Sequence, residues 1–392
     1  MKLFSQILAL LGVTAHLQAA PLVIHEWGTF TSLQDENGAA IGGINTDDEP
    51  VPGFVHRVGN LLRPDVAVRV MSKGVPTCHR DVIMRMETPV VYFYPPAGKT
   101  VTLDLEVEFS GGWMTEFYPG ATAITPGLEN GRLLPDTRGK LEWKGLRVGG
   151  DAAGPKTDSP VWLAPREVDA ASVTAASGET ERYLFYRGVA NLAAPLRMVR
   201  NGQSLRAERT DDKIPAPKKA WLVEVRPGGL GAFREVTVGV DGPATFSESE
   251  FGHKNLQRLR GEMHAALVAD GLFPKEAAAM LATWDKSYFQ SSGLRLFYLV
   301  PRAWTDSHLP IKVSVESAVT RVMVGRIEIV TPDQRRLLSL LAGGTGPLAP
   351  SDPPAAYYLL GRFANPLLLD ELRQRPNERL RDFTLALGLG PS

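Results

Sequence analysis

Residues 255–302, NLQRLRGEMHAALVADGLFPKEAAAMLATWDKSYFQSSGLRLFYLVPR, predict two helices followed by a buried strand. In the first part, Leu256, Leu259, Met263 and Leu267 recur at helical spacing with charged residues between them. This is the pattern of an amphipathic helix that buries one apolar stripe. The stretch is the longest in the chain in which spacing and helix-ending residues agree, so the fold prediction starts from it.

The second predicted helix lies between two helix-ending glycines, Gly271 and Gly293. Pro274 occupies the first turn, where a helix tolerates proline because the backbone N–H has no partner there. The residues that share its apolar side are Ala277, Leu281, Trp284 and Tyr288. We therefore expect a helix pair over about 254–290.

Two apolar runs follow and predict neighbouring strands beneath this helix pair. Residues 294–300, LRLFYLV, are apolar at nearly every position, which is typical of a strand covered on both faces. Residues 319–330, VTRVMVGRIEIV, are rich in β-branched residues. Gly325 in their middle indicates a bulge or a close backbone approach.

The chain before residue 245 predicts a β-rich body. Residues 101–108 alternate apolar and polar side chains, and similar short runs recur between segments rich in Gly, Pro, Asp and Ser. We expect a mainly β protein with an α+β portion: an antiparallel β-sandwich-like body with the helix pair packed on buried strands. The predicted divisions are 1–19, 20–245, 246–331 and a helical segment 332–392 that contains a Gly/Pro-rich linker.

Residues 1–19 predict a secretory signal peptide. Lys2 gives a positive start, an apolar stretch too short to span a bilayer follows, and Ala19 and Ala20 form a small-residue exit. The rest of the chain has no run long enough for a transmembrane helix. The single cysteine, Cys78, excludes an intramolecular disulfide. We expect a soluble periplasmic or secreted bacterial protein.

Charge and motifs exclude several functions. The 43 basic and 43 acidic residues cancel, so nothing favours nucleic acid as a partner. The phrase beginning at His25 and Glu26 lacks the second histidine of a zinc-protease helix, because position 29 is Thr29. No nucleophile elbow, phosphate loop or dinucleotide turn is complete.

The remaining polar residues give two site hypotheses. His25, His56 and His79 are the candidate metal ligands, for zinc or copper, with Glu26 or Glu87 as the general base. The alternative is that these histidines are hydrogen-bonded at strand ends and serve the fold. Candidate ligand-binding residues are the arginines in or beside apolar strands, with Glu328 or Asp285 as partners: Arg295, Arg302 and Arg326.

Several phrases resemble wording found in uncharacterised exported bacterial proteins: HEWGTFTS at 25–32, METPVVYFY at 86–94, and TWDKSYF with GLRLFYLVPR within 283–302. The resemblance implies a bacterial, exported origin and brings no known activity or catalytic residue.

The missing hydrolase motifs favour a binding or structural component of the cell envelope, with an envelope protein or a glycan as partner. Four Phe-Tyr pairs, at 93–94, 117–118, 185–186 and 297–298, suggest a core or its rim, with an aromatic platform for carbohydrate as the alternative. The sharper alternative function is a metal-dependent hydrolase with a histidine-ligated site.

Overall fold

The computed structural model describes residues 21–46, 50–61, 71–343, 357 and 359–389 of the chain. The predicted signal peptide (1–19) lies outside these residues, as do most of the Gly/Pro-rich linker and part of the acidic stretch near residue 48.

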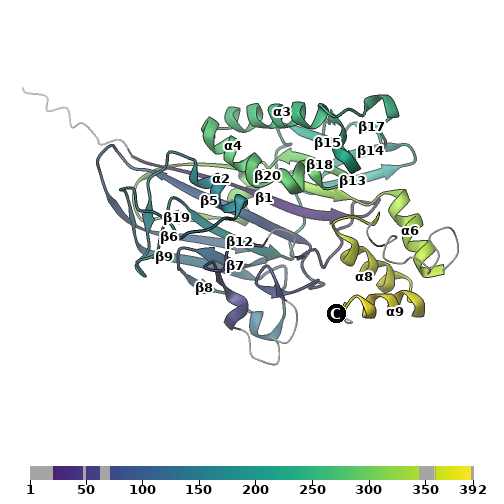
Figure 1. Ribbon diagram of the computed structural model, residues 1–392, viewed down its shortest axis with the longest axis horizontal. Coiled ribbons are helices and arrows are strands. Elements are labelled where there is room, and N and C mark those ends of the chain that lie inside the picture. The colour runs from purple at the N-terminus through teal and green to yellow at the C-terminus, as the bar shows by residue number, and fades with distance from the viewer. Residues whose placement is uncertain (1–20, 47–49, 62–70, 344–356, 358, 390–392) are drawn as a thin grey trace, which may run out of the picture.

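One large mixed sheet forms the centre of the molecule (Figure 1). Its strands run in the order β11 (Thr180–Glu181), β10 (Val173–Thr174), β9 (Arg138–Val148), β7 (Gly112–Tyr118), β12 (Leu184–Ala190), β5 (Met84–Tyr94), β1 (Leu22–Gln34), β20 (Ser317–Ile329), β18 (Gly293–Leu299), β15 (Ala220–Arg226) and β16 (Leu230–Glu235). Off this path, β2 (His56–Arg57) pairs with β7, β8 (Thr122–Ile124) pairs with β9, and β6 (Val101–Ser110) pairs with β9 and β19 (Ile311–Val313).

Two smaller sheets and the helices complete the described elements. The smaller sheets are β13 (Leu196–Asn201), β14 (Ser204–Arg209) and β17 (Asp241–Pro243), and the pair β3 (Met71–Ser72) and β4 (Val75–Pro76). The helices are α2 (Pro160–Arg166), α3 (Asn255–Ala269), α4 (Pro274–Thr283), α5 (Arg302–His308), α6 (Pro332–Gly343), α8 (Ala364–Gln374) and α9 (Glu378–Ala386), with a π-helical turn η5 (Lys286–Gln290) and 3-10 turns η1 (Val58–Leu61), η2 (Leu128–Asn130), η3 (Pro227–Gly229) and η4 (Glu248–Glu250).

The mainly β prediction with an α+β portion is confirmed, but a large mixed sheet replaces the expected antiparallel sandwich. The reason is β1, which pairs antiparallel with β5 on one side and parallel with β20 on the other, from Leu22↔Ser317 to Gln34↔Ile329. The sheet therefore continues across the boundary predicted near residue 245. Strands β15 and β16, expected in the first part of the chain, extend the sheet on the β18 side.

The helix pair and its strands form as predicted. The side chains of Leu256, Leu259, Met263 and Leu267 are buried on α3, and α4 begins at Pro274. Strand β18 pairs with β20, as expected for these two runs. In Figure 1, α3 and α4 lie over the part of the sheet that contains β15, β18 and β20.

Strand β1 is covered on both faces. Trp27 belongs to the apolar cluster that also holds α3, α4, Val90 and Tyr92. Ile24 and Phe30 belong to the cluster on the other face, where Phe30 contacts Phe109 of β6 at a ring-centroid distance of 6.3 Å. Burial on both sides fits the apolar residues on both faces of β1, and its buried polar side chains His25, Glu26, Thr29, Thr31 and Gln34 are hydrogen-bonded.

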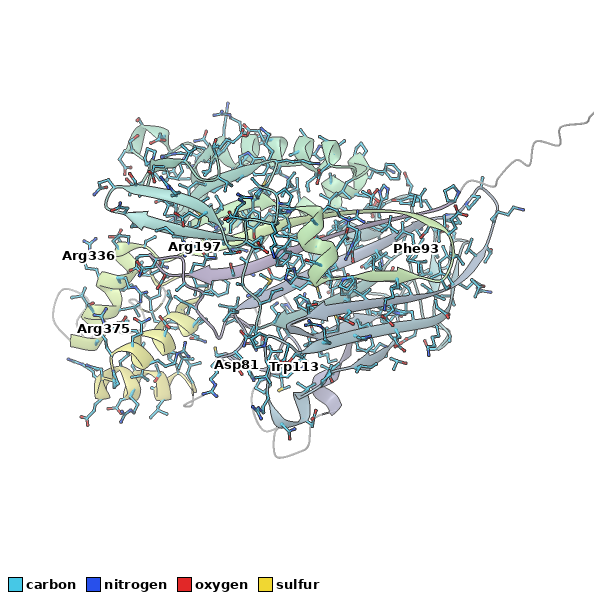
Figure 2. All side chains as sticks on the ribbon, turned by 180° about the vertical axis from the view of Figure 1, so that it is seen from behind. Asp81, Phe93, Trp113, Arg197, Arg336 and Arg375 are labelled. Carbon is cyan, nitrogen blue, oxygen red and sulfur yellow. The ribbon has the colours of Figure 1, made fainter. Side chains whose placement is uncertain are left out.

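The C-terminal helices α6, α8 and α9 gather at one end of the sheet (Figure 1). They bury Leu337, Leu367 and Leu380, together with the carboxylates Asp370 and Glu371 of α8. Figure 2 shows Arg336 and Arg375 on the outer surface of this group. In the part of the chain that the structure describes, no helix is both long and apolar enough to cross a membrane.

Candidate functional site

The phrases 25–32 and 86–94 lie side by side, because they form most of β1 and β5. The two strands keep a regular register except between Trp27 and Thr29, where Thr88 and Pro89 of β5 lie opposite Gly28 alone, so that β5 bulges. Within this bulge, Thr88 adopts φ +45, a conformation that costs a β-branched residue about 1–3 kcal/mol. A Cβ on Gly28 would approach Pro89 to 3.0 Å, so glycine fits this crowded point.

The polar side chains of these strands hold neighbouring elements together. Glu26, fully buried, accepts hydrogen bonds from Arg321 of β20 and from the Tyr186 hydroxyl of β12. Burial and the adjacent Glu26 carboxylate raise the pKa of Tyr186, so the hydroxyl stays protonated and donates a hydrogen bond to Glu26. The candidate general base Glu26 thus has fixed partners on both sides and lies away from solvent.

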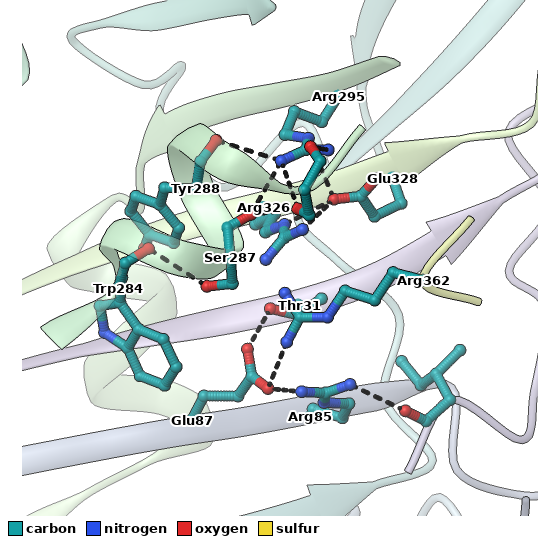
Figure 3. Close-up of polar contacts among 12 residues, drawn as sticks. Thr31, Arg85, Glu87, Trp284, Ser287, Tyr288, Arg295, Arg326, Glu328 and Arg362 are labelled. Carbon is teal, nitrogen blue, oxygen red and sulfur yellow. Dashed lines mark hydrogen bonds and ion pairs between the residues drawn. The ribbon is translucent and has the colours of Figure 1, made fainter. Parts of the chain in front are cut away.

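Glu87, the other candidate general base, is the centre of a buried ionic cluster (Figure 3). Its carboxylate accepts a hydrogen bond from Thr31 at 2.8 Å and forms an ion pair with Arg85. Lys73 and Arg362 lie 3.7 Å from the same carboxylate. These contacts join β1, β5 and the segment before α8, which indicates a role in holding the fold.

Arg295 and Arg326 lie beside this cluster in Figure 3, and both contact the predicted partner Glu328. Arg295 also donates hydrogen bonds to the Ser287 and Tyr288 carbonyl oxygens at 2.8 and 3.1 Å. A cation there satisfies carbonyls at the end of the π-helical turn. Burial lowers the pKa of Arg295 to about 9.

Arg302, the third candidate arginine, lies apart from this pair. Its side chain is 45% exposed and forms an ion pair of 2.7 Å with Asp306. The other predicted partner, Asp285, contacts Arg260. The structure therefore brings together two of the three candidate arginines, Arg295 and Arg326. Each of the three forms an ion pair with a carboxylate of the protein itself, Glu328 or Asp306.

The three candidate histidines do not converge. His25 contacts Glu276 of α4 at 2.8 Å, and His56 contacts Glu179 at 2.8 Å. His79 Nε2 donates to the Gly131 carbonyl oxygen at 3.1 Å. Among the described residues, no group of three or more His, Cys, Asp or Glu side chains is placed to hold a metal ion. The geometry thus gives the predicted zinc or copper centre no ligand set.

One of these histidines, His56, borders an open groove of about 510 Å³. The residues that line the groove come from β2, β7, β8, β9 and the turn between β10 and β11: His56, Phe117, Gly120, Ala121, Thr122, Glu142, Trp143, Lys144, Ala175, Ala176, Ser177 and Glu179. We call it the His56 groove. A second cavity, beneath α2, has room for only about one water molecule (10 Å³).

Glu179 fixes the orientation of His56 in this groove. The carboxylate accepts hydrogen bonds from the Gly120 N–H at 2.7 Å and the Ser177 hydroxyl at 3.0 Å, besides its contact with His56. Burial raises the pKa of Glu179, but the hydrogen bonds from the three donors lower it by more. The net shift of the pKa is therefore downward, and the carboxylate stays ionised. On its other side, the His56 ring stacks on Phe117 at 5.5 Å.

The hydrogen bond to Glu179 decides which nitrogen of His56 is available. An ionised carboxylate accepts, so Nε2 donates and carries a proton. In the neutral imidazole, Nδ1 is then the acceptor. The groove therefore contains a positioned imidazole whose orienting partner, Glu179, is itself held by two further donors, an arrangement suited to ligand recognition and to proton transfer.

Sequence reasoning named His56 and missed its partner. Glu179 lies 123 positions further along the chain, in a short turn next to Gly178, whose φ is +86. No motif spacing links the two residues. The only sequence signal was the turn composition of Ser177-Gly178, which predicts a turn and no function.

No protein-family model and no curated protein matches the chain. Among solved structures, the Fcho1 Mu homology domain of Danio rerio with bound Eps15 peptide is similar with a TM-score of 0.31 and 9% identity. The match covers 80% of this chain and 98% of that chain. A TM-score of this size does not assign a shared fold.

Proposed function

We propose that the protein is an exported binding component of the bacterial cell envelope and that the His56 groove is its ligand site. The observation that carries the proposal is the groove itself, whose volume of about 510 Å³ lies in the range of small-molecule and cofactor sites. The signal-peptide pattern and the resemblance to exported bacterial proteins support the location.

The polar groups of the groove also support binding. A ligand site needs a few polar groups in fixed positions on a concave surface. His56 and Glu179 fix one another, and the Gly120 backbone and the ring of Phe117 hold the pair in place. This preorganisation lowers the entropy cost of binding.

Envelope glycans and envelope proteins are the partners we expect. Of the four Phe-Tyr pairs, the one at Phe117 and Tyr118 borders the groove, and both side chains are buried there. Both rings lie nearly parallel to the His56 ring, at 5.5 and 6.1 Å, and, being buried, do not form an exposed platform. A glycan would therefore bind through the polar groups of the groove.

The metal-dependent hydrolase is not proposed, since His25, His56 and His79 each contact a different partner. The pair His56 and Glu179 does favour a second candidate, a hydrolase that uses His56 as a general base without the other two histidines. A screen of ester, peptide and glycoside substrates tests this candidate. Turnover that is lost in His56→Gln supports it, and absence of turnover leaves binding as the function.

Cell fractionation tests the location. We expect the chain in periplasm or medium, beginning near Ala20, as determined by mass spectrometry of the intact protein. A chain that retains Met1 and is found only in the cytoplasm contradicts the proposal.

A groove-filling substitution tests the site. Ala176 is exposed and lines the groove, so Ala176→Trp fills it without changing the core. Ala265→Trp is the matched control, on the exposed face of α3. In a pull-down from envelope extract, partners retained by the wild type and by the control are expected to be lost from Ala176→Trp. Equal recovery with both variants contradicts the assignment.

A further inference from the structure

From the side chains of the His56 groove, we infer that its ligand is a cation that donates hydrogen bonds, such as a primary ammonium or a guanidinium group. The inference rests on the proposed function of the groove as a ligand site. It adds the chemical class of the ligand, which the groove volume alone does not give.

The charged lining favours a cation. The described side chains of the groove include two carboxylates, Glu142 and Glu179, and one ammonium, Lys144. Glu179 stays ionised because its donors lower its pKa. With a neutral imidazole, the lining therefore carries one net negative charge, and the carboxylates are partly desolvated, with 24% and 29% of their side chains exposed.

The hydrogen-bonding capacity points in the same direction. Among the described residues, Glu179 Oε1 accepts a hydrogen bond from His56 alone, at 2.8 Å, whereas Oε2 accepts from Gly120, Ser177 and, at 3.1 Å, His56. Each carboxylate oxygen accepts two hydrogen bonds, so Oε1 has capacity for one more donor. Glu142 contacts Lys144 at 3.8 Å, a distance too long for a hydrogen bond.

His56 adds a third acceptor. With Nε2 donating to Glu179, Nδ1 of the neutral ring accepts. The groove thus offers three acceptors from three elements, and Lys144, with 77% of its side chain exposed, reaches into solvent. An ammonium has three donors and no acceptor, and a guanidinium has five donors, so both match this set.

An NMR titration with two probes of the same shape tests the ligand class. The probes are n-butylammonium and n-butyrate, and the signals are the His56 ring and the Gly120 amide. We expect n-butylammonium to shift both signals in a saturable way. Glu142→Gln is expected to weaken this binding about two- to fivefold, and Lys144→Gln to strengthen it by a similar factor. Glu316→Gln, an exposed carboxylate outside the groove, is the control.

The outcomes separate the ligand class from the ligand site. If n-butyrate binds instead, weakened by Lys144→Gln and strengthened by Glu142→Gln, the inferred class is wrong and the groove remains the site. If neither probe shifts the two signals, the inferred class is wrong, and the groove as a ligand site is decided by the Ala176→Trp pull-down. If Glu316→Gln weakens n-butylammonium as much as Glu142→Gln does, the effect is one of total charge, and the inference fails.

Discussion

Adding one methyl group at Gly325 is expected to destabilise the protein by about 1–3 kcal/mol. Gly325 pairs with Tyr298 across β20 and β18, and the Tyr298 ring lies over it. A Cβ at this position would lie 2.0 Å from the ring carbon Cζ and 2.3 Å from Cε1. Since ordinary contact begins near 3.4 Å, the ring or the strand must move by about 1.4 Å. Tyr298 is 1% exposed, so the surrounding core resists this movement.

The assay is urea unfolding followed by circular dichroism, with Gly261→Ala as the matched control. Gly261 is exposed on α3, and a methyl group added there would meet no atom within 4 Å, so alanine is expected to stabilise by about 0.5–1 kcal/mol. In a Tyr298→Leu background, Gly325→Ala is expected to cost less, because the ring is absent. A Gly325→Ala variant as stable as the wild type, beside a control that behaves as expected, would refute the close packing of β18 on β20.

Three further predictions concern buried and paired groups. Burial raises the pKa of Cys78 to about 11. Its thiol should therefore react with a disulfide reagent at pH 8 much more slowly in the folded protein than in the protein unfolded by guanidinium. Equal rates would contradict this burial. The pKa of Glu179 is lowered below the ordinary 4.5, so its contacts stabilise the fold above about pH 4.5 and are lost as the pH falls through the lower value. The difference in unfolding free energy between wild type and Glu179→Gln should therefore shrink in acid. A difference that stays constant with pH would argue against an ionised Glu179. Glu276→Gln places an amide opposite three donors, His25, Tyr94 and the Phe273 N–H. The substitution should lower the free energy of unfolding by about 1–3 kcal/mol, as measured by urea unfolding. An unchanged free energy would show that these contacts do not hold α4 on β1.

The local part of the fold could be predicted from the sequence. Periodicity placed the helix pair and the two strands below it, because a helix or strand with one apolar side repeats its pattern over neighbouring residues. Gly325 indicated a close approach, and the structure shows the Tyr298 ring against it. The helix predictions depended on the spacing of residues within one element, and each of the two strands was recognised from its own apolar run.

The sheet order could not be predicted, because pairing partners leave no trace in local spacing. Strand β1 lies beside β20 almost 300 residues later, and the alternation of apolar residues is the same for a parallel and an antiparallel neighbour. The short runs before residue 245 therefore read as a sandwich. The polar residues of β1 gave the same difficulty, since Glu26 meets Arg321 and Tyr186 from two distant strands.

The candidate site was predicted only in part for a similar reason. His56 was named by its chemistry, but its grouping with His25 and His79 assumed that nearness in sequence reflects nearness in space. Each histidine instead meets its own partner, and the partner of His56, Glu179, comes from a turn with no motif. Only the folded chain brings the two side chains to one groove.

The most direct test of the groove as a ligand site is native mass spectrometry of the protein purified from periplasm without denaturation. We predict a bound mass that is released on unfolding, is present in the wild type and Ala265→Trp, and is missing in Ala176→Trp. The same bound mass on all three proteins, or a mass on Ala176→Trp alone, would contradict the assignment of the His56 groove.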